Sequence, residues 1–383
     1  MDYNKKALEM HKKFKGKIEI KSKVPLNNRD DLSVAYTPGV AEPCREIAKD
    51  KEKVYDYTIK GNCVAVISDG SAVLGLGNIG PEAGLPVMEG KAVLFKEFAG
   101  IDAFPICLDV HKPEEIIRVV KAIAPVFGGI NLEDIKAPEC FEVESGLQDL
   151  GIPVMHDDQH GTAIVVLAAL TNALKVAKLQ KDKVNIVVNG AGAAGIAITR
   201  LLLSYGFRNI TLVDSKGAVH KKRKDLDGEK LKVAQLTNLN CVDGSLEVAL
   251  KGADVFIGVS KSGLLKKEMI KKMNSKPIIF AMANPIPEIM PDEARAAGAF
   301  IVATGRSDFP NQINNVLAFP GVFRGALNVR ATKITEKMKI GAAEALMSLV
   351  EKPSEENILP KALDKSVVPA VASAVQKAWL SGK

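Results

Sequence analysis

The run Lys183-Val-Asn-Ile-Val-Val-Asn-Gly-Ala-Gly-Ala-Ala-Gly-Ile-Ala197 joins an apolar strand to a helix through a glycine-rich turn. In this pattern the first glycine permits the tight turn, the second lets backbone N–H groups approach a pyrophosphate, and the third lets the helix pack closely on the strand. We therefore expect the whole turn to contact a dinucleotide, through Gly190, Ala191, Gly192, Ala193, Ala194 and Gly195.

A second strand, Asn209–Val213, follows the amphipathic stretch Ile196–Leu203 and ends in Asp214. This position is close to the ~20-residue offset at which an acid accepts a hydrogen bond from the adenosine ribose. Asp214 therefore favours NAD⁺, whereas Lys216 could hold the 2′-phosphate of NADP⁺. We expect both coenzymes to be used, with NAD⁺ slightly favoured.

Short apolar strands alternate with helical stretches over the rest of this half of the chain. The further expected strands are Val255–Val259, Ile278–Met282 and Phe300–Ala303. Such alternation predicts an α/β fold in which a doubly wound, Rossmann-type parallel sheet is covered by helices on both faces. The chain then continues into two helical stretches, Ile334–Val350 and Pro360–Leu380.

The first part of the chain has strands of its own, Val64–Ile67 and Ala103–Leu108, with a glycine-rich loop at Gly70–Gly84. We expect an N-terminal substrate and metal domain over residues 1–155. A coenzyme-binding domain with the C-terminal helices would occupy residues 156–383. Because no low-complexity linker separates the two, a packed pair with a cleft between them is the simplest arrangement.

Composition suits a soluble enzyme, with 383 residues of which 47% are hydrophobic and 25% charged. The net charge of +7 favours anionic small molecules over nucleic acid, because the basic run His220–Lys224 has no interleaved aromatic residues. That run is expected to be either a solvated loop or a segment beside the coenzyme.

Cysteine usage and hydropathy predict a cytoplasmic protein. The five cysteines are scattered without Cys-x-x-Cys spacing, which argues against a disulfide framework and a zinc ribbon. The N-terminus lacks the apolar core of a signal peptide. The longest apolar run, Ala163–Leu170, is shorter than the ~20 residues of a membrane helix, so no membrane partner is expected.

Two acidic pairs, Glu133-Asp134 and Asp157-Asp158, are candidates for holding a hard divalent cation. Adjacent carboxylates repel one another, and oxygen ligands suit Mg²⁺ or Mn²⁺. Each pair alone could also be a solvated loop or a helix N-cap. A zinc site on His156 and His160 is disfavoured, because the Glu of a zincin helix is absent and a glycine follows the second histidine.

Three further residues could take part in chemistry. Lys91 stands among apolar neighbours, where burial could make it a base, although a helix lysine reaching water would look the same. Tyr36 could equally be a packed tyrosine in a turn. Asn284 follows the strand Ile278–Met282 at its carboxyl end, where open α/β sheets bind ligands.

Taken together and in order, these motifs resemble the malic enzyme family in its short bacterial and archaeal form, over roughly residues 25–375. The matching motifs are Tyr36-Thr-Pro-Gly-Val, Ser68-Asp-Gly-Ser-Ala-Val-Leu-Gly-Leu-Gly-Asn-Ile-Gly, Pro86-Val-Met-Glu-Gly-Lys, Leu132-Glu-Asp, His156-Asp-Asp-Gln-His-Gly-Thr-Ala, Ala283-Asn-Pro and Asn314-Asn-Val-Leu-Ala-Phe-Pro-Gly.

The resemblance implies oxidative decarboxylation of (S)-malate to pyruvate and CO₂, with reduction of NAD⁺ or NADP⁺, by a homodimer or larger homo-oligomer. It makes Tyr36 the proton donor and Lys91 the general base. It further implies that Glu133, Asp134 and Asp158 bind Mg²⁺ or Mn²⁺. Asn284 and Asn315 would contact the substrate.

One departure from the family pattern concerns the substrate carboxylate. Larger members have an arginine two residues after the Asp-Gly of the second motif, and this chain has Ala72. Ser71 or a backbone N–H of the glycine loop would then have to bind that carboxylate. The alternatives to this activity are a metal-independent amino-acid dehydrogenase of similar two-domain plan and a non-enzymatic module that senses nucleotides.

Overall fold

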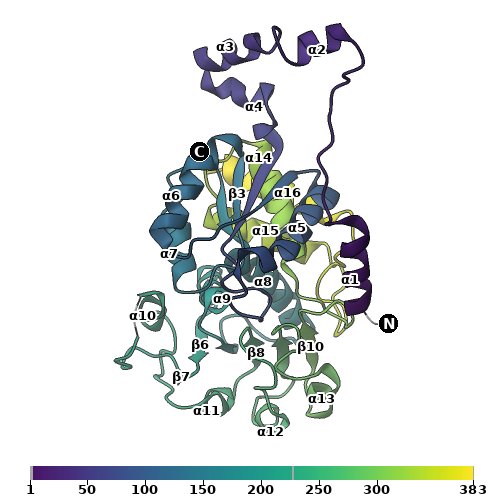
Figure 1. The fold of residues 1–383 in the computed structure, drawn as a ribbon. Coiled ribbons are helices and arrows are strands. Elements are labelled where there is room, and N and C mark those ends of the chain that lie inside the picture. Colours follow the sequence, from purple (N-terminus) through teal and green to yellow (C-terminus); the bar gives the residue numbers. More distant parts are fainter. Residues whose placement is uncertain (1–2, 227, 383) are drawn as a thin grey trace.

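The computed structural model describes residues 3–226 and 228–382 and contains two sheets of mainly parallel strands (Figure 1). The first has four strands in the order β2-β1-β3-β4, and the second has six in the order β10-β9-β8-β5-β6-β7. Of the six, only β7 pairs antiparallel to its neighbour. The expected α/β class with a Rossmann-type sheet is confirmed.

The first sheet is formed by β1 (Cys63–Ser68), β2 (Asp102–Cys107), β3 (Gly129–Leu132) and β4 (Val154–His156). Sequence patterns indicated β1 and β2 but missed the two shorter strands. The helices of this part of the chain are α5 (Gly80–Ala99), α6 (Pro113–Ile123) and α7 (Glu139–Ser145). The glycine-rich loop is therefore shorter than expected, because its last residues form the first turn of α5.

The second sheet carries the glycine-rich turn between its first strand and the helix that follows. Its strands are β5 (Asn185–Asn189), β6 (Asn209–Asp214), β7 (Gly217–Ala218), β8 (Val255–Gly258), β9 (Ile278–Ala281) and β10 (Ile301–Thr304). Its connecting helices are α9 (Ala193–Ser204), α10 (Gly228–Ala234), α11 (Leu246–Leu250), α12 (Lys267–Ile270) and α13 (Pro291–Ala296).

Between the two sheets runs α8 (Asp157–Ala177), which packs against α9 and against the C-terminal helix α15 (Glu336–Ser348). It is the one helix of the described residues that is long and apolar enough to cross a membrane by length and composition. However, 72% of its apolar window is buried inside the protein, as in the core helix of a globular fold. Its polar first turn lies directly after β4.

The C-terminal helices α14 (Phe319–Asn328), α15 and α16 (Val367–Leu380) pack on one another. They also contact the N-terminal part of the chain. The rings of Phe319 and Phe323 lie edge-on to Phe95 of α5, with centroids 4.8 and 5.4 Å away. These aromatic contacts belong to one apolar core that also includes α8 and the second sheet.

Residues 29–57, which we call the arm, project away from the rest of the molecule (Figure 1). The arm contains α2 (Arg29–Ala35), α3 (Ala41–Lys49) and α4 (Val54–Tyr57), and none of these helices has a buried residue. An extended segment connects it to α1 (Tyr3–Phe14), which lies against the body (Figure 1). Apolar side chains of the arm are open to solvent, since Leu32 is 53% exposed and Val34 is 76% exposed.

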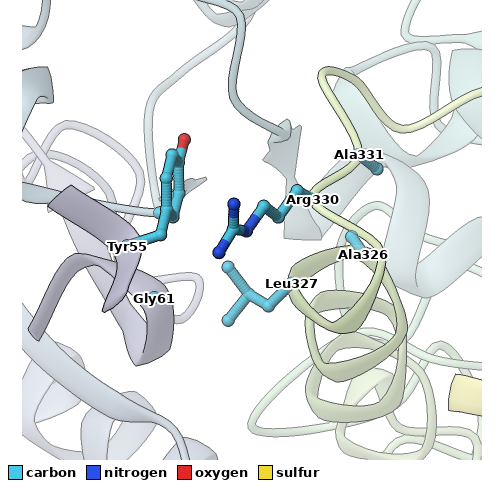
Figure 2. Close-up of a pocket in the computed structure, with 7 residues that line it drawn as sticks. Tyr55, Gly61, Ala326, Leu327, Arg330 and Ala331 are labelled. Carbon is cyan, nitrogen blue, oxygen red and sulfur yellow. The ribbon is translucent and has the colours of Figure 1, made fainter. Parts of the chain in front are cut away.

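The arm meets the body at a cavity of about 130 Å³ that lies between α4 and the end of α14. Figure 2 shows Tyr55 and Arg330 facing one another across it. The Arg330 guanidinium lies 4.9 Å from the Tyr55 ring centroid and 2.7 Å from Asp56 Oδ1. This contact fixes the base of the arm while its tip stays free of the body.

Candidate active site

Lys91 of α5 projects into a cluster of carboxylates where the first sheet meets α8. Its Nζ lies 2.5 Å from Asp157 Oδ2 and 3.1 Å from Glu133 Oε1. The same ammonium stands 4.5 Å from the centroid of the Phe319 ring. The lysine side chain is only 13% exposed and the two carboxylates are fully buried or nearly so. The expectation of a buried lysine is therefore met.

Strand order explains why the two acidic pairs meet. Glu133-Asp134 directly follows β3 and Asp157-Asp158 directly follows β4, and these strands are parallel neighbours whose carboxyl ends share one edge. The Asp134 backbone N–H donates to Asp158 Oδ2 at 2.9 Å. Asp134 itself adopts a left-handed conformation, with φ of 52°. The structure thus brings Lys91 together with all three expected metal ligands.

Burial and mutual repulsion dominate the electrostatics of this cluster. Burial raises the pKa of Glu133 and of Asp157, although the Lys91 charge opposes both shifts. Burial, with the nearby charge of Asp158, raises the pKa of Asp134 to about 8. Burial also disfavours the charge of Lys91, but Asp157, Glu133 and Asp158 outweigh it and raise the lysine pKa. The three carboxylates therefore favour the charged form of Lys91 in this cluster, whereas burial alone would favour the neutral form.

The cluster matches a hard divalent cation in its donor chemistry. Asp134 Oδ2 and Asp157 Oδ1 are buried without a hydrogen-bond partner, and carboxylate oxygens are the ligands that Mg²⁺ and Mn²⁺ prefer. Over residues 3–226 and 228–382, no three His, Cys, Asp or Glu side chains are already arranged to hold a metal ion. A cation would therefore have to draw the carboxylates closer together.

Asn315 lies beside this cluster. A Cβ placed on Gly161 would meet Asp157 Oδ1 at 1.8 Å and the Asn315 Cβ at 3.2 Å, so all three positions are in contact around the first turn of α8. Gly161 is required there because any side chain would collide with the aspartate. Asn315 is also one turn before Phe319, the residue under Lys91.

Asn284 lies in the loop after β9 of the second sheet. A Cβ on Gly75, whose φ is +74°, would lie 2.5 Å from the Asn284 carbonyl oxygen. The glycine-rich loop after β1 and the loop after β9 are thus in contact. The Asn284 side chain lies next to Gly305, after β10, so its contact with the substrate stays a prediction.

Ser71 makes two hydrogen bonds within the protein. Its hydroxyl donates to Asp69 Oδ1 at 2.6 Å and accepts the Lys136 backbone N–H at 2.9 Å. Because a serine has one hydroxyl proton, Ser71 would have to give up its bond to Asp69 in order to donate to a substrate carboxylate. Ser71 is buried and connects the β1 loop to the segment that follows Glu133-Asp134. Its contact with the substrate stays a prediction.

Tyr36 is not near Lys91 in the chain. It caps α2 on the arm and is 67% exposed, whereas Lys91 lies on α5 in the body (Figure 1). The two residues that the resemblance names as acid and base thus lie on different parts of one chain. The sequence could not reveal this, because the Tyr36-Thr-Pro-Gly-Val motif fixes a local turn and not the direction in which it projects.

The glycine-rich turn has the geometry expected of a dinucleotide site. Gly190 has a φ of +123°, and a Cβ on Gly195 would lie 1.7 Å from the Gly190 carbonyl oxygen. Gly192 has open space where a side chain would be and directly precedes the first turn of α9. The first and third glycines therefore serve the fold, whereas the second leaves room for a ligand at a helix N-terminus.

Asp214 at the end of β6 is more fully engaged than expected. Arg223 binds both its oxygens, with Nη1 2.8 Å from Oδ1 and Nη2 3.1 Å from Oδ2. The Lys216 backbone N–H donates to Oδ1 at 2.9 Å, while the Lys216 ammonium pairs with Asp225 at 3.0 Å. Although burial opposes it, Arg223 holds the pKa of Asp214 below its ordinary value. The basic run His220–Lys224 is therefore not wholly a solvated loop, because its Arg223 binds Asp214.

Two functional candidates escaped the sequence argument. Asp157 was noted only as half of an acidic pair, yet it is the closest partner of Lys91. Arg223 was counted within a basic run, although it sits between Asp214 and Asp225. The adjacency of Asp157 to Asp158 was a usable signal. Nothing in the local sequence marks Arg223, because its partners depend on the path of the chain after β6.

Comparison with family models gives two matches, one over the first two strands of the first sheet and one over the whole second sheet. The model of the malic enzyme N-terminal domain matches residues 15–115, and that of the malic enzyme NAD binding domain matches residues 159–379.

Similar proteins extend over nearly the whole chain. A bifunctional malic/malolactic enzyme of Bacillus subtilis is 59% identical over 99% of this chain and 93% of that protein. An NAD-dependent malic enzyme of Geobacillus stearothermophilus is 58% identical over 95% of this chain and 76% of that protein.

Among solved structures, an NAD-dependent malic enzyme from Thermotoga maritima has a TM-score of 0.94 at 54% identity, covering 97% of this chain and 98% of that one. A malic enzyme from Pyrococcus horikoshii has a TM-score of 0.95 at 52% identity, covering 99% and 91%.

Proposed function

Because the chain belongs to the malic enzyme family, we propose that it converts (S)-malate to pyruvate and CO₂ with Mg²⁺ or Mn²⁺ and either NAD⁺ or NADP⁺. The observation that carries this proposal is the buried Lys91, held by Asp157 and Glu133 where two acidic pairs converge. A metal-independent amino-acid dehydrogenase has no use for such a cluster.

The residues suited to hold the cation are Glu133, Asp134 and Asp158. When bound, a divalent cation supplies positive charge for the C1 carboxylate and C2 oxygen of malate, both before and after the C–C bond breaks. Burial first, and then repulsion between the carboxylates, raises the pKa of Glu133 and Asp134, and a cation would relieve the repulsion.

Lys91 is the proposed base for the malate hydroxyl. To act it must first lose a proton, and Asp157 Oδ2 at 2.5 Å is placed to receive that proton. Burial of Asp157 favours this transfer because it raises the aspartate pKa. The neutral Lys91 would then take the C2 hydroxyl proton, and a bound NAD⁺ or NADP⁺ would supply the hydride acceptor. The C3–C4 bond breaks next, which releases CO₂.

Tyr36 is the proposed acid that protonates C3 of the resulting enolate. Since Tyr36 stands on the arm, away from Lys91, we assign it to the active site of a second copy of the chain. The exposed apolar side chains of Leu32 and Val34 support docking of the arm on another copy, because such groups favour burial. The functional unit would then be a homodimer or a larger homo-oligomer.

The remaining assignments concern the ligands. Asn284 and Asn315 would contact malate from the two sides of the cleft, and backbone N–H groups of the glycine loop would replace the missing arginine. The turn Gly190–Gly195 would bind the pyrophosphate, and Asp214 with Lys216 would lie at the adenosine ribose. The five free cysteines support a reducing compartment such as the cytoplasm.

The test is an assay of purified protein with malate, Mn²⁺ and each coenzyme, following reduced nicotinamide and pyruvate together. Equimolar formation of the two that stops with a chelator is expected. Lactate should be measured as well, because the relative from Bacillus subtilis is named for a malolactic activity. Turnover of malate that persists in full after chelation would overturn the metal assignment, and no turnover under any condition would overturn the function.

A further inference from the structure

Glu144 of α7 lies behind the acidic cluster and is not part of it. Its Oε1 accepts the His156 backbone N–H at 2.9 Å, and its Oε2 lies 3.0 Å from His160 Nε2. Lys339 Nζ of α15 lies 2.9 Å from His160 Nδ1 and 3.3 Å from His160 Nε2. The three side chains therefore form a connected line that joins α7, α8 and α15.

The chemistry of the line fixes the direction of each hydrogen bond. An ammonium can only donate, so His160 Nδ1 must accept from Lys339. In a neutral imidazole Nε2 then carries the hydrogen and donates to Glu144 Oε2. The negative charge of Glu144 and the positive charge of Lys339 are thus joined by an oriented imidazole, whose tautomer these two partners set together.

The two histidines contacted by Glu144 flank the acidic pair of α8. His156 is the residue before Asp157, and His160 follows Asp158 by two positions. The N-cap position of α8 is His156, whose side chain makes no capping hydrogen bond. Glu144 therefore anchors the first turn of this helix at two points. It accepts the His156 backbone N–H at the start of the turn and contacts the His160 side chain one turn later.

Any rotation of that turn would move two contacts of the active site together. Asp157 Oδ2 would leave Lys91 Nζ, and Asp158 Oδ2 would leave the Asp134 backbone N–H. A cavity of about 270 Å³ lies beside Glu144, His160 and Lys339 and is also lined by Arg200 and Glu229. Because space is available there, filling volume is not what demands a glutamate at position 144.

We propose that Glu144 is a positioning residue for malate oxidation, which holds Asp157 and Asp158 in register with Lys91 and Asp134 through its bonds to His156 and His160. The proposal rests on the proposed function, since it concerns the same acidic cluster. Glu144 touches neither substrate nor cation, and Lys339 supports it by fixing the His160 imidazole.

Glu144→Gln tests this with little change in shape. The amide oxygen can still accept one N–H, but the amide nitrogen then meets a second donor, either at His156 or at His160, so one of the two bonds is lost. We expect Mn²⁺ affinity, measured by isothermal titration without substrate, to fall about tenfold or more, the range found when groups that orient metal ligands are removed. NADH affinity, measured by fluorescence, should stay within about twofold because the Gly190–Gly195 turn is not in this line.

The matched control is Glu142→Gln, which removes a carboxylate from the exposed side of the same helix. It should leave both affinities unchanged. Lys339→Met is the second variant, since it keeps Glu144 but removes the group that orients His160, and it should lower Mn²⁺ affinity by a smaller factor. In the double variant the two losses should not add, because both act through one imidazole.

Wild-type Mn²⁺ affinity in both Glu144→Gln and Lys339→Met would overturn the proposal. So would an equal loss of Mn²⁺ and NADH affinity, which indicates a general loosening of the fold. If wild-type protein fails to oxidise malate, the proposed function fails, yet the Mn²⁺ titration still decides the role of Glu144. Should Glu144→Gln not fold, the Mn²⁺ titration of Lys339→Met decides alone. A lowered affinity supports the positioning role of Glu144, and a wild-type affinity overturns it.

Discussion

Lys91 Nζ and Asp157 Oδ2 lie 2.5 Å apart with both side chains withdrawn from solvent, so the lysine that would act as the base already touches a proton acceptor. Asp157→Asn keeps the size of this partner but cannot take the proton. We expect malate oxidation to fall by a factor of about 10² or more, the usual contribution of proton transfer by a positioned group. NADH binding, measured by fluorescence, should not change. Oxidation at the wild-type rate would exclude Asp157 as the acceptor.

Lys91→Ala and Tyr36→Phe should fail at different steps. Loss of the base should stop malate oxidation but spare the tautomerisation of enolpyruvate, whereas loss of the acid should stop tautomerisation. Both reactions can be followed separately by absorbance, with the wild-type protein as control. Malate oxidation at the wild-type rate in Lys91→Ala would show that another group is the base.

The same two variants also test whether Tyr36 acts on another copy. In a mixed dimer one site combines the intact lysine of one chain with the intact tyrosine of the other. A random mixture should therefore form pyruvate from malate at about a quarter of the wild-type rate, above the rate of the two folded variants mixed without exchange. The variants should be unfolded, mixed and refolded together to allow exchange. A mixture no more active than the separate variants, despite exchange shown by tagged chains, would place both residues in one chain.

The coenzyme preference should respond to Arg223. This guanidinium neutralises Asp214, the carboxylate that would otherwise repel a 2′-phosphate. Arg223→Gln should therefore lower kcat/KM for NADP⁺ about tenfold or more, which corresponds to a loss of ~1.4 kcal/mol of binding free energy, while kcat/KM for NAD⁺ changes little. Lys216→Ala is the comparison, because the Lys216 ammonium pairs with Asp225. Equal losses with both coenzymes would mean that Arg223 only supports the loop.

Two glycines of the coenzyme turn should differ on substitution. Gly195→Ala forces a Cβ against the Gly190 carbonyl oxygen, so we expect a loss of stability of about 1–3 kcal/mol in urea unfolding. Gly192→Ala meets open space, and its unfolding should match wild type. Its methyl group should nevertheless weaken NADH binding, since a pyrophosphate has to approach that backbone. Unchanged NADH affinity in Gly192→Ala would argue against this location for the phosphates.

Acid should weaken the contribution of Glu144 to stability. Burial opposes its charge, but His160 and Lys339 outweigh burial and lower the pKa to about 2. A carboxylate whose pKa is lower in the folded protein stabilises the fold above its unfolded pKa of ~4.3, and loses that effect as pH falls towards 2. The stability gap between wild type and Glu144→Gln, on the order of 2–3 kcal/mol at neutral pH, should therefore close over this range. A gap independent of pH in urea unfolding would contradict the ionised state of Glu144.

The sequence predicted those features that depend on local pattern. The glycine turn between β5 and α9 follows from residue order, and the two acidic pairs are visible in the sequence. That these pairs meet depends on the short strands β3 and β4, which the sequence pattern missed. The sequence could not identify partners that only the folded path brings together. The Ser71 hydroxyl accepts the Lys136 backbone N–H, 65 positions along the chain, and Arg223 reaches back to Asp214. The position of Tyr36 depends on the direction of the arm, which no short motif encodes.

The projecting arm has a consequence for how turnover scales with the amount of enzyme. If each catalytic centre needs a tyrosine carried by another molecule, the rate per chain depends on protein concentration as well as on substrate. Dilution would then separate Lys91 from its acid and produce a lag or a falling specific activity, even though every chain stays folded. Conversely, an isolated peptide with the sequence of residues 29–57 would compete for the docking position and act as an inhibitor that resembles neither malate nor a nucleotide.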